Sequence, residues 1–139
     1  MMPWMAVKEP SHPLEKRDLL HADAPNAARI DAIAASMAAA GRFPEAIDYV
    51  EITKNPALLA QAEADAVKRG SAWLLQQVER IGGKPVPPET WVRLSQAAQA
   101  AERWLDAVRA LAIAGLSEEA ETLRAAKCPD YEPFKPLGK

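Results

Sequence analysis

The sequence repeats one short pattern where a helix of small residues ends and another helix begins. The fullest copy, AAAGRFPEAI, covers residues 38–47. Glycine is favoured just after a helix because it adopts the left-handed backbone conformation without steric cost, so Gly41 should end the first helix. A proline and an acid then open the second helix, where Phe43 and Ala46 are expected to pack against the first. This spacing predicts two helices joined by a tight turn.

The same arrangement returns twice in the second half of the chain. Residues 100–108 read AAERWLDAV, with Glu102 in the place of the glycine, and residues 114–120 read AGLSEEA. Recurring helix–turn–helix punctuation indicates stacked helical hairpins, an architecture that commonly holds other proteins. The residues expected to pack at these turns are Gly41, Phe43, Ala46, Trp104, Ala107, Gly115 and Ala120.

The composition favours an all-α fold with about seven to eight helices. Hydrophobic residues make up 49% of the 139 residues, much of it alanine, the strongest helix former, and no strand pattern emerges. We expect an extended N-terminal arm at 1–12, a helical-hairpin domain at 13–127 and an extended, proline-rich C-terminal tail at 128–139. The segment 82–88, GGKPVPP, is a linker that could divide the domain into two blocks.

Capping residues locate several helix ends. Asp23 is expected to cap the second helix, and Pro44 to open the third. Asn55 and Pro56 form a combined stop and start signal. Ser117 is expected to cap the last helix, ahead of two glutamates that suit the positive end of the helix dipole.

The charge balance and the lack of a long apolar run argue against nucleic acid and against direct insertion into a membrane. Lysine and arginine total 17 and aspartate and glutamate 19, a formal net charge of −2. Nucleic-acid binding normally needs a basic excess on one face, so it is not expected. No apolar run approaches the roughly 18–20 residues that span a bilayer, so any membrane association should come only through partners. The expected partners are other protein subunits.

Cysteine content and the N-terminal sequence bear on the compartment. The lone Cys128 cannot form an internal disulfide, which favours a reducing environment. The first ten residues lack the basic stretch and long apolar core of a secretory signal. We therefore expect an intracellular protein, cytoplasmic or organellar, that is not secreted.

No pattern indicates a catalytic, metal or cofactor site. His12 and His21 are nine residues apart, and with Cys128 they match no zinc-binding spacing. The sequence holds no GxGxxG, GxxxxGK[ST] or GxSxG. A run of two glycines and a lysine at 82–84 is followed by prolines and preceded by no strand. The chain is therefore not expected to be an enzyme, and no cofactor or metal is expected.

Aromatic residues carry the candidate contacts with partners. Trp73, Trp91 and Trp104 fall at apolar helical positions and are expected in the core, although an exposed tryptophan would instead be an interface anchor. Trp4, Tyr131 and Phe134 lie in the two terminal segments, which cannot build a core of their own. They are the predicted partner-binding residues; mobile, hydrated ends are the alternative.

The run from Gly41 to Tyr49 resembles the turn between the two helices of a tetratricopeptide repeat. In that family a small residue lets the helices cross closely, an aromatic fills the wedge, and an alanine is buried between them. The resemblance implies that Gly41 and Ala46 are packing positions, with Phe43 or Tyr49 as the aromatic. Ala46 and Ala107 are 61 residues apart, so a strict 34-residue period is absent. The irregular spacing looks more like the degenerate α-solenoids of clathrin and coatomer, which are binding scaffolds.

These observations together predict a function without chemistry. We expect a non-catalytic scaffold for protein–protein interaction, or a structural subunit of a larger assembly. An alternative is an accessory subunit of an organellar or membrane-associated complex, held through its tails. A small helical enzyme, or the regulatory domain of one, is the alternative from another class.

Overall fold

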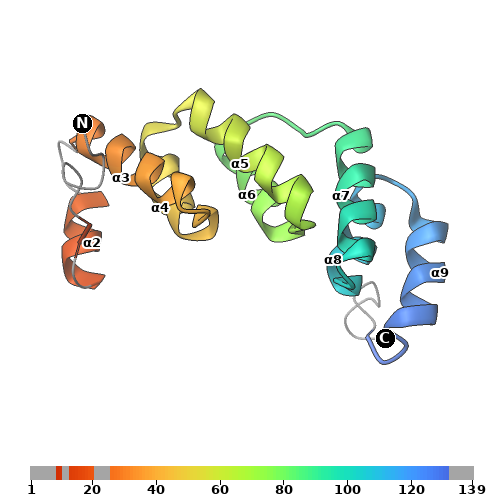
Figure 1. The fold of residues 1–139 in the computed structure, drawn as a ribbon. Helices are drawn as coiled ribbons and strands as arrows, with labels where there is room; N and C mark the ends of the chain where they lie inside the picture. The colour runs from red at the N-terminus through yellow and green to blue at the C-terminus, as the bar shows by residue number, and fades with distance from the viewer. Residues whose placement is uncertain (1–8, 11–12, 21–25, 132–139) are drawn as a thin grey trace, which may run out of the picture. The chain divides into compact units, whose positions relative to one another are not determined.

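The computed structural model describes residues 9–10, 13–20 and 26–131, and within them it is all-helical, as the sequence predicts (Figure 1). No strand occurs in these residues. The eight helices described are α2 (Pro13–Leu20), α3 (Ala27–Ala39), α4 (Phe43–Thr53), α5 (Pro56–Arg69), α6 (Ala72–Gly82), α7 (Pro88–Ala100), α8 (Trp104–Ile113) and α9 (Ser117–Lys127).

The chain forms two compact units. The N-terminal unit comprises Met1–Asp65 and Gln76–Lys84, and the C-terminal unit comprises Ala66–Leu75 and Pro85–Lys139. The turn between α5 and α6 therefore belongs to the C-terminal unit. One boundary falls within the proline-rich segment at 82–88, and the others cut through α5 and α6.

The core of the N-terminal unit lies between α3 and α4, which pack side by side. Isoleucine, alanine and methionine recur on one face of α3 at helical spacing and meet the apolar face of α4. A hydrogen bond from Thr53 Oγ1 to Asp31 Oδ1, 2.5 Å long, joins the same two helices. The buried residues of this core are Leu20, Ile30, Ile33, Ala34, Met37, Ala46, Tyr49, Val50 and Leu58.

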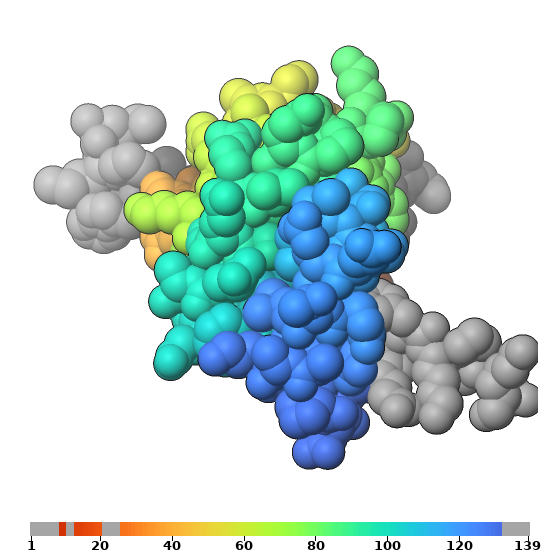
Figure 2. All heavy atoms as spheres, turned by 90° about the vertical axis from the view of Figure 1, so that its right-hand side faces the viewer, coloured from red at the N-terminus to blue at the C-terminus, as the bar shows by residue number. Residues whose placement is uncertain are grey.

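In the C-terminal unit, α8 packs against both α7 and α9. Figure 2 shows the face on which α9, in blue, covers part of the green and cyan surface of α7 and α8. Trp91 and Leu94 of α7 are buried. The buried Ser95 hydroxyl donates to the carbonyl of Ala107 at 3.0 Å, which ties α7 to α8. Only Ala120 of α9 is buried, so most of the surface of α9 is exposed and polar.

Four helix junctions share one backbone turn. In each, a residue with positive φ follows the helix, and the N–H of the next residue donates to the carbonyl five positions earlier, as in a Schellman motif. The positive-φ residues are Gly41 (φ 76°), Gly70 (70°), Glu102 (58°) and Gly115 (88°). The turn bonds run from Arg42 to Met37 (2.8 Å), Ser71 to Ala66 (2.9 Å), Arg103 to Ala98 (2.8 Å) and Leu116 to Leu111 (3.0 Å).

This turn fixes the register of each helix that follows. The new helix begins two residues after the positive-φ residue, at Phe43, Ala72, Trp104 and Ser117. The residue five positions after it is buried at every junction: Ala46, Leu75, Ala107 and Ala120. The structure is thus compatible with a helical repeat. The 61-residue interval between the first and second sequence copies contains a further copy, since Leu75 lies 29 residues after Ala46 and 32 before Ala107.

The structure differs from the sequence-based expectation at two helix starts. Asn26, and not Asp23, is the N-cap of α3, and its Oδ1 accepts the N–H of Arg29 at 3.1 Å. Asp23 itself lies outside the described residues. Ser117 is the first residue of α9 rather than its cap, and Leu116 occupies the cap position without a side-chain bond. The shared turn explains this, because it already fixes the backbone there.

Candidate protein-interaction surfaces

Two side chains at the start of α8 hold the turn between α5 and α6. Arg103 donates from Nη1 to the carbonyl of Arg69 at 3.2 Å. The Asp106 carboxylate accepts the backbone N–H of Ala72 at 3.1 Å, and its other oxygen accepts Arg103 Nε at 3.1 Å. The last carbonyl of α5 and the first N–H of α6 are groups that a helix leaves without internal partners. The Arg103–Asp106 pair provides hydrogen-bond partners for both groups, and so it joins the start of α8 to the turn between α5 and α6.

The turn between α5 and α6 also packs directly against α7, at Gly70. A Cβ atom built on Gly70 would lie 2.5 Å from the Cα and 2.7 Å from the Cβ of Ala98. Only glycine fits there, both for its positive φ and for this close approach to α7. The buried alanine at position 98 completes the contact.

Large apolar side chains are exposed at the same register position in two successive turns. Trp73 is 45% exposed and Leu105 is 49% exposed, and each is the third residue after the positive-φ residue of its turn. Their chain neighbours, Ala72 and Asp106, are hydrogen-bonded to each other. The two apolar side chains therefore come from the same edge of the C-terminal unit.

Leu105 belongs to the exposed face of α8. Leu105, Arg109 and Ile113 are spaced i, i+4 and i+8, so they follow one face of the helix, opposite the buried Val108 and Leu111. Ile113 is 39% exposed, and Arg109 is exposed as well. In the described part of the chain, no group forms a hydrogen bond or ion pair with the Arg109 guanidinium. We call Trp73, Leu105, Arg109 and Ile113 the α6–α8 ridge.

The prediction that Trp73 packs in the core is wrong. Trp91 is buried as expected, and Trp104 is half-buried with the ammonium of Lys127 4.9 Å from its ring centre. Trp73 is exposed because the third position after the turn faces outward in every copy. The residues at that position are Pro44, Trp73, Leu105 and Glu118, all exposed. Aligning the copy around Gly70 with the others is the signal that would have revealed this.

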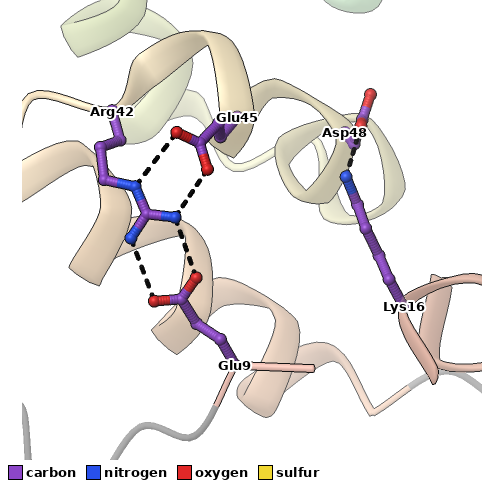
Figure 3. Close-up of polar contacts among 5 residues, drawn as sticks. All are labelled: Glu9, Lys16, Arg42, Glu45 and Asp48. Carbon is purple, nitrogen blue, oxygen red and sulfur yellow. Dashed lines mark hydrogen bonds and ion pairs between the residues drawn. The ribbon is translucent and has the colours of Figure 1, made fainter. Parts of the chain in front are cut away.

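A second charged cluster lies in the N-terminal unit, around Arg42 (Figure 3). The Arg42 guanidinium donates to both oxygens of Glu9, at 3.1 Å each, and to both oxygens of Glu45, at 3.2 and 2.6 Å. These bonds raise the pKa of Arg42, and the bond from Arg42 lowers the pKa of the Glu45 carboxyl below its usual 4.5. Arg42 and Glu45 occupy the register of Arg103 and Asp106, but their third partner is a carboxylate of the preceding segment.

A neighbouring ion pair attaches α2 to α4. Lys16 Nζ lies 2.8 Å from Asp48 Oδ2 and 5.3 Å from the centre of the Tyr49 ring (Figure 3). Burial raises the pKa of the Tyr49 hydroxyl. Exposed pairs of this kind contribute little to stability, because water screens the two charges. The charged contacts of Glu9 and Lys16 therefore hold these two residues beside α4 without binding them strongly.

An open groove lies on the surface of each of the two units. A groove of about 420 Å³ in the N-terminal unit is lined by Pro13, Lys16, Arg17, Leu20, Asp48, Glu51 and Ile52. A groove of about 470 Å³ in the C-terminal unit is lined by Gln99, Leu111, Glu118, Glu119, Thr122, Leu123 and Ala126. Within the described residues, no three histidine, cysteine or acidic side chains are grouped as metal ligands would be. Both grooves offer alkyl surface and scattered charges, a lining suited to a peptide chain.

The predicted tail contacts are only partly described. Trp4 and Phe134 lie outside the described residues, as do His12 and His21. Tyr131 is exposed, and its carbonyl accepts a 2.7 Å hydrogen bond from Arg124 Nη1. Its role as a partner contact stays a prediction.

No protein-family model, curated protein or solved structure matches this chain. Over the residues that the structure describes, none of the helices combines the length and apolarity needed to cross a bilayer.

Proposed function

We propose that this chain is a non-catalytic scaffold for protein–protein interaction, or a structural subunit of a multiprotein assembly. The observation that carries the proposal is the exposure of Trp73 and Leu105 at one register position of two hydrogen-bonded turns. Tryptophan is enriched among the residues that dominate interface energies, and burying an apolar side chain of this size contributes about 1.5–3 kcal/mol. Each of the two side chains is already about half buried, so a partner that covered both would gain roughly half of this energy from each.

The repeated turn supports the same reading. Repeats in which each unit packs on its neighbours present extended binding surfaces. The four Schellman turns and the buried residue five positions beyond each provide such a unit here. We propose that the chain is a degenerate relative of tetratricopeptide-like or clathrin-like helical repeats, in which intervals of 29, 32 and 13 residues between the four buried positions replace a strict period.

The proposal is tested by comparing the proteins that co-purify with three versions of the full chain from its native cells. The versions are the wild type, a ridge variant with Trp73→Ser and Leu105→Ser, and Leu14→Ser as the matched control. Leu14 is 56% exposed but lies on α2, in the other unit. We expect specific subunits to be lost with the ridge variant and kept with the control. Far-UV circular dichroism establishes that all three are folded.

Two results would contradict the proposal. One is a purified chain that carries no specific protein in any version, above the level of an unrelated helical protein. The other is turnover of a small molecule by the purified chain that survives the ridge substitutions. Loss of partners from the Leu14 control as well as the ridge variant would place the binding surface elsewhere.

A further inference from the structure

We propose that the α6–α8 ridge binds an amphipathic helix that carries acidic side chains beside its apolar face. This inference rests on the proposed scaffold function and adds the chemistry of the partner. Three features support it: the spacing of the apolar residues, the exposed Arg109 between Leu105 and Ile113, and the packing that holds the α5–α6 turn and α8 in place.

The spacing of the ridge suits a helix. Leu105 and Ile113 are eight residues apart on α8, which is about 12 Å along the helix axis. Trp73 adds a third apolar group at the end where α8 begins, beside the turn that Asp106 holds. Helices that dock on apolar surfaces do so through residues spaced i, i+3 or i+4 and i+7, which cover a similar length. Two turns of a partner helix would therefore cover the ridge.

Arg109 is the one charged side chain among the four ridge residues. Arg109 lies between Leu105 and Ile113 on the same face and has no hydrogen-bond or ion-pair partner in the described parts of the chain. The nearby Arg103 is already bonded to Asp106 and to a backbone carbonyl. An arginine that becomes partly buried by a partner needs an acceptor, and a carboxylate gives it the strongest, often bidentate, bond. A partner helix should therefore place an aspartate or glutamate opposite Arg109.

The same charge disfavours a second copy of this chain as the occupant. In a two-fold dimer the same patch faces itself, so each ridge would meet the other copy's Arg109. The carboxylate closest in sequence, Asp106, is already engaged by Arg103 and by the Ala72 N–H. One arginine among apolar side chains is also far from the basic face that nucleic acid requires. An acidic, apolar helix is the occupant that fits both features.

The ridge is held firmly enough to present these groups in a fixed arrangement. Trp73 follows the turn that packs against α7 through Gly70 and Ala98. The opposite face of α8 is buried through Val108 and Leu111. Preorganised anchors lose less conformational freedom on binding, so the ridge can act as a rigid docking surface.

A displayed library of random helical peptides, selected on the immobilised full chain, provides the test. We expect enriched peptides with apolar residues at helical spacing and an aspartate or glutamate on the flank. The binding of one such peptide is then measured by fluorescence anisotropy against wild type, Arg109→Glu and a Trp73→Ser, Leu105→Ser double variant. Arg93→Glu is the matched control, since Arg93 is an exposed arginine of α7 in the same unit.

The expected effects are specific to charge and position. Loss of one buried charge pairing should weaken binding by about tenfold or more in Arg109→Glu. Changing the acidic peptide residue to lysine should restore binding to Arg109→Glu and weaken binding to wild type. The double variant should lose binding, and Arg93→Glu should stay within about twofold of wild type, because exposed rim charges contribute little.

The contrary outcomes separate this inference from the scaffold proposal. Selected peptides that are basic or uncharged, or that bind the double variant as well as wild type, overturn the inference alone. A chain that selects no peptide and forms a dimer by light scattering, dissociated by Leu105→Arg, makes the ridge a contact between copies and also overturns it. A chain that selects no peptide and stays monomeric overturns it as well. The scaffold proposal is judged independently by the native co-purification.

Discussion

The α5–α6 turn approaches α7 closely, so alanine should lower the unfolding free energy more at Gly70 than at Gly115, although the two glycines share a backbone conformation. Gly70 and Gly115 both have positive φ, at 70° and 88°. An alanine at Gly115 would meet no atom within 4 Å, so Gly115→Ala should cost only the strain of an L-residue at positive φ, about 1–2 kcal/mol. Gly115→Ala is therefore the control for backbone strain alone.

At Gly70 the same methyl group meets the α7 backbone. Its Cβ would lie 2.5 Å from Ala98 Cα, whereas carbon atoms pack at about 3.5–4 Å, so the two elements would have to separate by about 1 Å. Crowding of a packed core adds roughly 1–3 kcal/mol. We therefore expect Gly70→Ala to lose about 2–5 kcal/mol of unfolding free energy, against about 1–2 kcal/mol for Gly115→Ala.

Urea unfolding followed by far-UV circular dichroism measures this difference, provided the denaturant slopes of the two variants match that of wild type. A larger loss for Gly70→Ala supports the close packing of the two turns. Equal losses for the two variants would refute it, because they would leave only the shared backbone strain.

Further predictions concern the charged groups at the turns. Glu102→Gly should raise the unfolding free energy by about 0.5–1 kcal/mol, because it removes the strain of positive φ at the cost of some unfolded-state entropy; a decrease in urea unfolding would contradict this. Asp106→Ala should cost about 1–2 kcal/mol, since the N–H of Ala72 loses its acceptor, and hydrogen exchange at that amide should accelerate; unchanged exchange would count against the bond. Because Arg42 lowers the pKa of Glu45 below 4.5, the stabilisation by Glu45 is present above pH 4.5 and disappears as the pH falls through the lowered value. Glu45→Gln should therefore be less stable than wild type at neutral pH and equal to it in strong acid, and a difference that persists in acid would rule out this linkage.

Many of the helix boundaries follow from start and stop signals in the sequence. Gly41, Pro56 and Gly83 mark helix boundaries because each has a backbone preference that acts locally. The copy around Gly70 was missed, because it shares only the glycine and a helix start with the other copies. Glu102 shows why: the turn is defined by positive φ and one hydrogen bond, which a non-glycine residue can also adopt.

The candidate interaction surface was harder to predict than the helices. Trp73 has the apolar character of a core residue, and only its register relative to the turn makes it exposed. The turn that carries Trp73 is tied to the start of α8 by a hydrogen bond between residues 72 and 106, which are 34 positions apart. Local propensities carry no information about such a contact. Arg109 drew no attention in the sequence because its lack of a partner is a tertiary property.

One type of turn, which contains a residue with positive φ, recurs at four junctions. It sets the register of the helix that follows each junction, so that one face of that helix is buried and the ridge residues are exposed. Backbone chemical shifts and amide exchange of the full chain in solution test it most directly at Glu102, the one copy without glycine. We predict positive φ at Glu102 and a protected amide at Arg103, matching those at Gly70 and Ser71. A negative φ at Glu102 with a rapidly exchanging Arg103 amide would contradict the shared turn, and with it the common register on which the ridge depends.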